Sequence, residues 1–389
     1  MEQSFLDNIN IKTKCYKKLF VHENTLLLSI IRLVLCSLFF NSAQSVCQVN
    51  NKSIFYFTQS TIPKAMSIED THTLSFGDSL FLVQTKEDIP LYYFQRYQTG
   101  VCFDNKCRPL DILIYWNITG RYLGFKLPDG EFLSKTDHEP FKSSEYERMH
   151  ELLANSELPF SNISFYDIIV DKPKNIATID GTSGATAANL SKYVVQGAAY
   201  TTYTLWNIVY GANRQLIMDN TVNSLTTELI ERILKSPDQT DKIWILECIN
   251  EETEMSSEVL HAMQSQISGD DFYLAYKAIH AIKKNHLSDT KVQDSIITAY
   301  PRADHSIKSL IIDKLLDAPF LSEEVIRLTK SLLHEINGKQ LGDILKLYDT
   351  HKINDKETIE IILELTTHQN FFIANQAKKF LEKQNLKDE

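Results

Sequence analysis

The sequence predicts two parts of different fold class, an α+β part over residues 46–211 and an all-α part over residues 212–389. Alternating apolar residues and most of the aromatic residues lie in the first part, which is typical of half-buried strands. The second part repeats an apolar pattern every 33 residues, which indicates a solenoid of helix pairs. A chain of 389 residues is long enough for two separate cores.

The N-terminal segment, residues 1–45, has the composition of an export signal. Four lysines precede an apolar run at 26–40, and small residues follow it. Arg32 interrupts this run, which is shorter than the roughly 20 apolar residues needed to span a bilayer. We interpret the segment as a signal peptide cleaved after Ser45, so that the mature protein is exported to the periplasm or another extracytoplasmic compartment. The alternative is an uncleaved segment that anchors the protein in the membrane.

Strands are predicted at 53–57 and 79–83, where apolar and aromatic residues alternate with polar ones. Residues 111–125 are expected to form a β-hairpin, because two β-rich runs flank a short polar turn that ends in Gly120.

Two helices are predicted after the hairpin. Apolar residues recur at helical spacing over 143–154. A longer helix is expected from near Thr186 to Tyr210, with Gly211 as its C-terminal stop. The aromatic residues of this helix are at spacings that favour a core stripe over a cofactor-stacking surface. They are Tyr193, Tyr200, Tyr203, Trp206 and Tyr210.

Four cysteines remain after cleavage at Ser45, an even number that permits two disulfides in an exported chain. Cys102 and Cys107 are the favoured pair, because they close a short loop and their spacing differs from that of a redox C-x-x-C motif. Cys248 lies in a helical core pattern and is expected to be a buried thiol.

The repeat can be followed at single positions. Steps of 33 residues from Ile245 reach only apolar residues, namely Ala278, Ile311, Ile344 and Ala377. About five units of two helices fit into the second part, and Ser322 and Asn354 are expected to be N-caps.

These units resemble HEAT-like repeats, whereas the signatures of ankyrin and tetratricopeptide repeats are absent. The array is either a docking surface for another protein, or a rigid spacer or stabilising appendage, because repeats bury their apolar faces against each other in every case.

The formal net charge of −10 argues against a nucleic-acid-binding protein, since no basic excess is available to neutralise phosphates. The sequence contains no H-E-x-x-H motif, no nucleophile elbow and no P-loop, so no catalytic or metal-ligating residues are assigned. Asp137 and His138 are interpreted as part of a solvated turn.

The segment Asp180-Gly181-Thr182-Ser183-Gly184-Ala185-Thr186 places a carboxylate, a turn and a hydroxyl directly before the longer predicted helix. A helix start of this kind favours a phosphate, because its backbone N–H groups are unpaired and the helix dipole is positive there. Gly184 would let the backbone approach a ligand closely. The same residues could instead act only as helix N-caps and a turn.

This segment resembles the D-x-x-[S/T]-G-A-[S/T] attachment motif of the bacterial FMN-binding domain family, and all five fixed positions match. The resemblance implies a small α+β FMN-binding-like domain with FMN joined through its phosphate to Thr186. Asp180, Ser183, Gly184 and Ala185 would shape the site for a flavin transferase that performs the attachment.

Two functions are consistent with these features. The first is an exported flavoprotein that carries FMN on Thr186, transfers electrons and docks to a redox partner protein through the helical repeats. The alternative is a non-catalytic extracytoplasmic interaction protein whose FMN-binding-like domain holds no cofactor.

Overall fold

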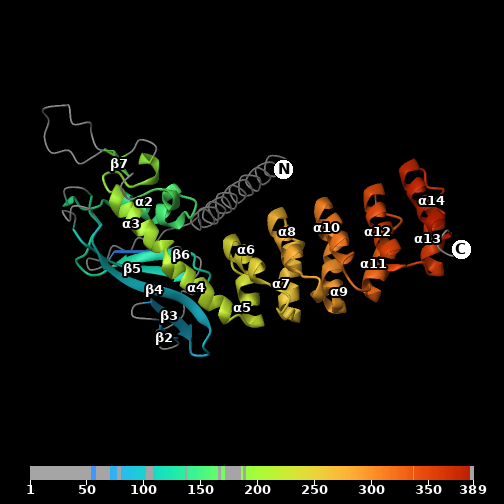
Figure 1. Cartoon of the computed structure of the whole chain (residues 1–389), viewed down its shortest axis with the longest axis horizontal. Helices are drawn as coiled ribbons and strands as arrows, with labels where there is room; N and C mark the ends of the chain where they lie inside the picture. Colours follow the sequence, from blue (N-terminus) through green and yellow to red (C-terminus); the bar gives the residue numbers. More distant parts are fainter. Residues whose placement is uncertain are drawn as a thin grey trace, which may run out of the picture.

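The computed structural model describes residues 54–57, 71–76, 80–101, 108–135, 138–164, 168–170, 185–186, 190–335 and 337–385. A β-sheet with a few helices lies at one end of the molecule, and a row of helix pairs extends away from it (Figure 1). The predicted order, an α+β part followed by a helical part, is confirmed. The segment 1–53 and the pair Cys102 and Cys107 lie outside the described residues.

The sheet has six strands, all paired antiparallel, in the order β1-β6-β5-β4-β3-β2. Its strands are β1 (Ile54–Phe57), β2 (Thr71–Phe76), β3 (Leu80–Thr85), β4 (Pro90–Thr99), β5 (Leu110–Asn117) and β6 (Tyr122–Leu127). The hairpin predicted at 111–125 is therefore confirmed as β5 and β6, and the predicted strands at 53–57 and 79–83 correspond to β1 and β3.

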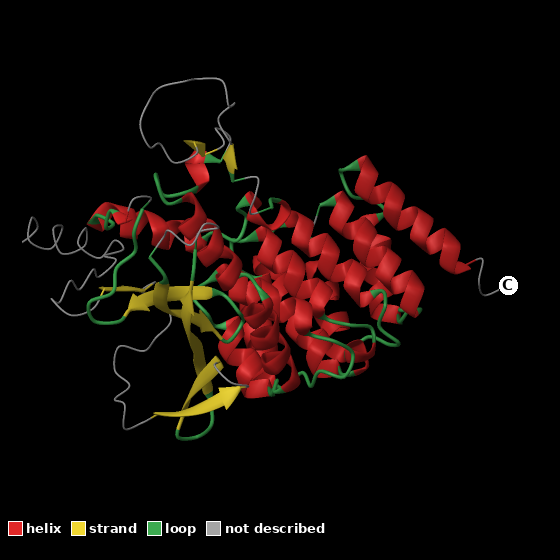
Figure 2. Ribbon diagram, turned by 60° about the vertical axis from the view of Figure 1, so that its left-hand side comes forward, coloured by secondary structure: helices red, strands yellow, loops and turns green. Residues whose placement is uncertain are grey.

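Helices cover one face of the sheet, and the strands and helices share one core. The residues at the centre of β5 that face this core, Ile112, Ile114 and Trp116, are fully buried. The covering helices are α2 (Ser143–Ala154), α3 (Ala199–Val209) and α4 (Ala212–Asn223). The helix predicted at 143–154 is confirmed as α2. Figure 2 shows the sheet on one side of the molecule and the last helix pairs on the other.

The longer helix predicted from near Thr186 is wrong at its start. Ala185–Thr186 form the short strand β8, which pairs with β7 (Ile169–Val170), and α3 begins only at Ala199. A 3-10 turn at Ser191–Tyr193 and Gly197, whose φ of +76° is left-handed, interrupt a helix between these points. The predicted stop is correct, because α3 ends at Val209 and Gly211 separates it from α4.

The second part is a stack of five helix pairs among the described residues. Figure 1 shows one layer made of the odd-numbered helices α5 to α13 and another made of the even-numbered helices α6 to α14. The pairs are α5 (Thr227–Leu234) with α6 (Gln239–Cys248), α7 (Ser257–Ile267) with α8 (Phe272–Ala281), α9 (Thr290–Ala299) with α10 (His305–Leu315), α11 (Glu323–Leu332) with α12 (Gly338–His351), and α13 (Lys356–Leu365) with α14 (Phe371–Asn385).

The predicted register of these helices is confirmed, because every 33-residue step from Ile245 reaches a side chain with 0 % exposure. Ser322 is the N-cap of α11, as expected, and its hydroxyl accepts a hydrogen bond from Val325 N at 3.2 Å. Asn354 is not an N-cap: Asp355 has that role for α13. Both residue types are good N-caps, so the sequence pattern does not distinguish neighbouring positions.

Ion pairs are also present between successive even-numbered helices of the stack. The Lys277 ammonium group on α8 pairs with Glu247 on α6, and that of Lys346 on α12 lies 3.5 Å from Asp313 on α10. Lys383 on α14 pairs with Asp349 on α12. In each of these pairs at least one side chain is more than half exposed, so the pair contributes little free energy on its own and the buried apolar contacts hold the stack together.

Cys248 on α6 is a free thiol, but it is half-buried rather than fully buried as expected. Burial raises the pKa of this thiol to about 11. Among the described residues, no helix combines the length and the apolar composition that a bilayer-spanning helix requires.

His150 makes the stability of the sheet part sensitive to pH. It is buried between α2 and β6, and its Nδ1 lies 3.0 Å from the Tyr122 hydroxyl. Burial lowers the pKa of His150 to about 4 from 6.5. Because the unfolded chain takes up this proton at a higher pH than the folded chain, stability is lost as the pH falls from 6.5 towards 4.

We expect this one group to lower the free energy of unfolding by about 2 kcal/mol between pH 7 and pH 5. Urea unfolding at the two pH values should show a smaller difference in His150→Gln, which keeps a hydrogen-bonding side chain but does not titrate. The matched control is His261→Gln at an exposed position of α7. An equal pH dependence in His150→Gln and the wild-type protein would contradict the assignment.

Candidate functional site

The structure describes only part of the predicted flavin-attachment segment. Asp180, Ser183 and Gly184 lie outside the described residues, and Ala185 and Thr186 are backbone partners of Val170 and Ile169. Thr186 therefore lies on a strand, 13 positions before the start of α3, and not at a helix N-terminus. Among the described residues, Thr186 has no free helix N–H groups beside it to hold a phosphate.

The aromatic residues of α3 form a packing stripe, as predicted. The Trp206 indole N–H donates to Asn155 O at 2.9 Å, and the Tyr210 hydroxyl donates to Leu153 O at 2.9 Å. The Tyr203 hydroxyl donates to Ile163 O at 2.8 Å. These bonds tie α3 to the end of α2 and to the segment after it, so the three side chains are structural.

An extensive polar arrangement lies where the sheet meets the helix stack. It is built on the turn between β5 and β6, residues Asn117 to Arg121. The Asn117 side-chain oxygen accepts hydrogen bonds from Thr119 N at 3.1 Å and Arg121 N at 2.7 Å, which fixes the turn from within. Gly120 has a φ of +77°, and an added Cβ would lie 3.0 Å from the side chains of Arg214 and Met218 on α4. A glycine is required here both for the backbone conformation and for the close approach of the helix.

Two further bonds anchor the turn to helices. The Trp116 indole N–H donates to Val209 O at the end of α3 at 2.9 Å. The Thr221 hydroxyl on α4 donates to Ile118 O at 2.5 Å. The turn is therefore held in place from both sides before it reaches the stack.

At the centre of this arrangement is the carboxylate of Asp241 on α6, whose residue is 3 % exposed. It accepts hydrogen bonds from Asn117 Nδ2 and Thr119 Oγ1, both at 2.7 Å, and from Ser236 Oγ at 2.8 Å. Arg121 donates to both carboxylate oxygens, from Nε at 3.0 Å and from Nη2 at 2.9 Å. We call these five residues the junction network.

The junction network keeps its central charges ionised. Burial alone would raise the pKa of the Asp241 carboxyl group, but the hydrogen bonds and the positive charge of Arg121 outweigh it and the pKa is lowered. Burial alone would lower the pKa of the Arg121 guanidinium, and Asp241 raises it instead. A carboxyl group with a lowered pKa stabilises the fold above its ordinary value of 3.8 and loses this contribution as the pH falls below it.

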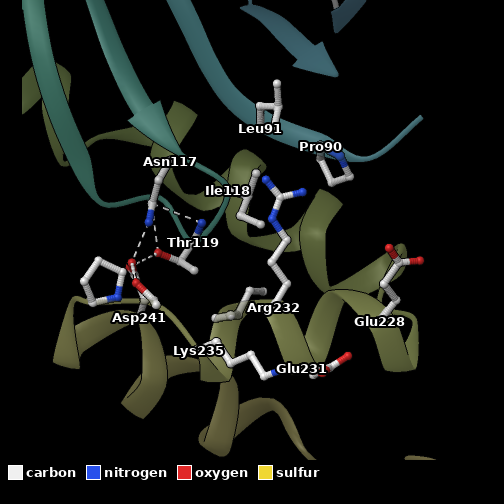
Figure 3. A pocket seen from close by; sticks show the side chains of 13 residues that line it. Pro90, Leu91, Asn117, Ile118, Thr119, Glu228, Glu231, Arg232, Lys235 and Asp241 are labelled. Atoms are coloured by element: carbon white, nitrogen blue, oxygen red, sulfur yellow. Dashed lines mark hydrogen bonds and ion pairs between the residues drawn. The ribbon is translucent and has the colours of Figure 1, made fainter. Parts of the chain in front are cut away.

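A cleft of about 510 Å³, the junction cleft, opens beside the network (Figure 3). Figure 3 shows Arg232 extending from α5 towards Ile118 and Pro90, while Asn117 and Thr119 point at Asp241. Lys235 on the cleft wall pairs with Glu231. The volume is within the range of small-ligand sites. However, Asp241 already accepts five hydrogen bonds, so its carboxylate is a structural group and not an available proton acceptor.

A second cleft, of about 390 Å³, lies on the other side of Arg232, between the β3–β4 turn and α4–α5. We call it the hairpin cleft. It shares Pro90, Glu228 and Arg232 with the junction cleft. Among the described residues, no group of three or more His, Cys, Asp or Glu side chains is arranged to hold a metal ion.

The turn at 117–120 is predicted by the sequence, but its contact with the helix stack is not. The bond between Asn117 and Asp241 joins positions 124 residues apart, and such a pairing leaves no periodic signal in one sequence. The sequence contains only a local signal for this turn. Asn117 and Thr119 provide hydrogen-bonding side chains and Gly120 provides the left-handed residue, which together are typical of a fixed turn.

No protein-family model and no curated protein matches the sequence.

Replacing Asp241 with Asn should lower the free energy of unfolding by about 3 kcal/mol, because it leaves the partly buried guanidinium of Arg121 without its main partner. The matched control is Asp238→Asn. Asp238 lies 3.2 Å from Arg121, is more exposed and caps α6, a role that Asn also fulfils. This control should lose less than about 1 kcal/mol. Urea unfolding at pH 7 measures both, and similar losses in the two variants would show that the buried carboxylate has no special importance.

Proposed function

We propose that the protein is an interaction protein without catalytic activity of its own, and that its helix stack is a HEAT-like solenoid with a partner-binding surface. The observation that carries the proposal is a group of exposed aromatic side chains on α8. Phe272 is 51 % exposed, Tyr273 is 49 % exposed and Tyr276 is 36 % exposed.

Packing within the stack does not account for these aromatic residues. The residues that precede and follow Phe272 by 33 positions are Gln239 and His305, and those related to Tyr273 in the same way are Thr240 and Ser306. Neighbouring repeats therefore pack with polar residues at both positions. Exposed aromatic side chains that the fold does not need are typical of binding surfaces.

The surface formed by Phe272, Tyr273 and Tyr276, which we call the α8 surface, also has polar groups in contact with its rings. The Lys277 ammonium group lies 5.4 Å from the centre of the Tyr273 ring, and the rings of Tyr276 and His280 stack at 3.9 Å. Rings that are fixed in this way lose little entropy on binding. A peptide segment with apolar anchor residues is the kind of partner that such a surface accepts.

To test this, peptides should be selected from a random library on the full chain and their affinity measured by fluorescence polarisation. We expect peptides with apolar anchors to bind, and to bind at least 10-fold more weakly to the Phe272→Ser/Tyr276→Ser variant. Leu363→Ser, at a 57 % exposed position of α13, is the control and should not change the affinity. Peptides that bind the α8 variant and the wild-type protein equally would contradict the proposal.

A covalent flavin carrier is the second candidate, favoured by the full match of residues 180–186 to the attachment motif. In this case Thr186 would carry FMN through a phosphoester bond, a flavin transferase would attach it, and the stack would bind a redox partner in an extracytoplasmic compartment. The flavin would supply the redox chemistry, and the protein would supply its placement.

Co-expression with a flavin transferase in an exporting host tests this candidate. The expected product is a fluorescent protein that keeps the mass of FMN minus water after denaturation. Thr186→Val should abolish the adduct, whereas Thr182→Val, in the same segment but at a variable position of the motif, should retain it. A wild-type protein without an adduct under these conditions would exclude the carrier function.

A further inference from the structure

The last pair of the described stack, α13 and α14, exposes large apolar side chains at the end of the row away from the sheet (Figure 1). Leu363 near the end of α13 is 57 % exposed, and Phe371 at the start of α14 is 82 % exposed. The outer face of a terminal helix pair in a repeat stack is normally polar, because it faces water. Large apolar side chains on such a face indicate a contact surface.

The 33-residue register places both side chains on the outer face of the pair. The corresponding residues of the preceding pair are Lys330 and Gly338. Both contact the pair that follows: the Lys330 ammonium group lies 2.8 Å from the carboxylate of the α13 N-cap, and Phe372 packs so closely on Gly338 that an added Cβ would overlap its ring. Leu363 and Phe371 are therefore at the positions that contact the next helix pair inside the stack.

Charged residues of both signs lie on the same face. Glu382 on α14 corresponds to Asp349 on α12, which pairs with Lys383 of the following helix. Lys356 at the start of α13 corresponds to Glu323, which lines the groove between α11 and α13. The side chain of Lys356 is 90 % exposed. A face that presents an apolar group, a cation and an anion on two neighbouring helices can be complementary to a copy of itself.

The other end of the stack is already covered by the sheet, whose β5–β6 turn donates hydrogen bonds to Asp241 on α6. Head-to-tail stacking on that end is therefore blocked, and a two-fold arrangement of two outer faces remains. An axis parallel to the two helices and midway between them places α13 of one copy over α14 of the other. Leu363 then lies over Phe371 of the partner subunit near the α13–α14 loop, and Lys356 lies over Glu382 of the partner subunit at the far end.

We propose that the outer face of α13 and α14 binds a second copy of this chain about such a two-fold axis. The helices have 10 and 15 residues, which at about 1.5 Å per residue gives a face about 15–20 Å long. With the helices about 10 Å apart, the contact covers on the order of 400 Å² per copy, at the low end of specific interfaces. We therefore expect a dissociation constant in the micromolar range. This face is separate from the α8 surface, so either can fail without the other.

Sedimentation equilibrium of the full chain, from about 1 µM to about 1 mM, measures the dissociation constant of the dimer. Phe371→Asp should raise it at least 10-fold, because the substitution places a charge against Leu363 of the partner subunit. An acidic residue in the first turn of a helix is favourable, so α14 should stay folded.

Phe272→Asp is the matched control. Phe272 is the first residue of α8, as Phe371 is of α14, and it lies three repeats earlier in the same register. It is 51 % exposed. This variant should change the dissociation constant less than 2-fold.

Charge reversal tests the two-fold arrangement. Lys356→Glu and Glu382→Lys should each weaken the dimer at least 3-fold, because each change places like charges opposite one another. The variant that carries both changes restores opposite charges across the axis, and its dissociation constant should return to within about 2-fold of the wild-type value. Damage to the fold of either helix would not be repaired in this way.

A protein that stays monomeric at about 1 mM would overturn the proposal, as would a dimer that Phe371→Asp leaves intact. Loss of the dimer in Phe272→Asp but not in Phe371→Asp would assign self-association to the α8 surface instead. A double reversal that fails to restore the dimer would exclude the two-fold arrangement. The charge reversals change exposed side chains, so they decide the matter even if Phe371→Asp unfolds α14.

Discussion

The buried carboxylate of Asp241 is the interaction on which the arrangement of the two parts depends. It lies on the first helix pair of the stack, yet three of its hydrogen-bond donors belong to a turn of the sheet, Asn117, Thr119 and Arg121. A charge at 3 % exposure is tolerated only when its hydrogen-bonding capacity is satisfied. The sheet part must therefore be folded for the first helix pair of the stack to be stable. Asp241 of the stack, for its part, accepts the hydrogen bonds of the polar β5–β6 turn.

This dependence explains why both clefts lie at the same place. The junction network fixes α6 against the turn, and Thr221 fixes α4, so α5 between them is held beside the β3–β4 turn. Side chains of α5, above all Arg232 and Glu228, then face the sheet across narrow gaps that neither part would form alone. Ligand-binding clefts are common at the boundary between two packed units, because each unit contributes one wall of the cleft.

The periodic and the local features of the fold could be predicted from the sequence, whereas contacts between residues far apart in the chain could not. The buried positions from Ile245 onward followed from the 33-residue period, because each repeat buries the same face. The hairpin followed from its turn residues. The helix expected to begin near Thr186 begins only at Ala199. The apolar pattern continues through Gly197, where the backbone is left-handed, so the pattern does not reveal this interruption. The partners of Asp241 could not be predicted, because they come from side chains about 120 positions away.

Hydrogen exchange of the intact protein, followed by mass spectrometry over increasing denaturant, tests most directly whether the sheet part and the start of the stack form one cooperative unit. Peptides from β5–β6 and from α5–α6 should exchange through a common opening with the same free energy, because the junction network joins them. Exchange of α5–α6 at lower denaturant, while β5–β6 stays protected, would show that the two parts open independently and would contradict the account.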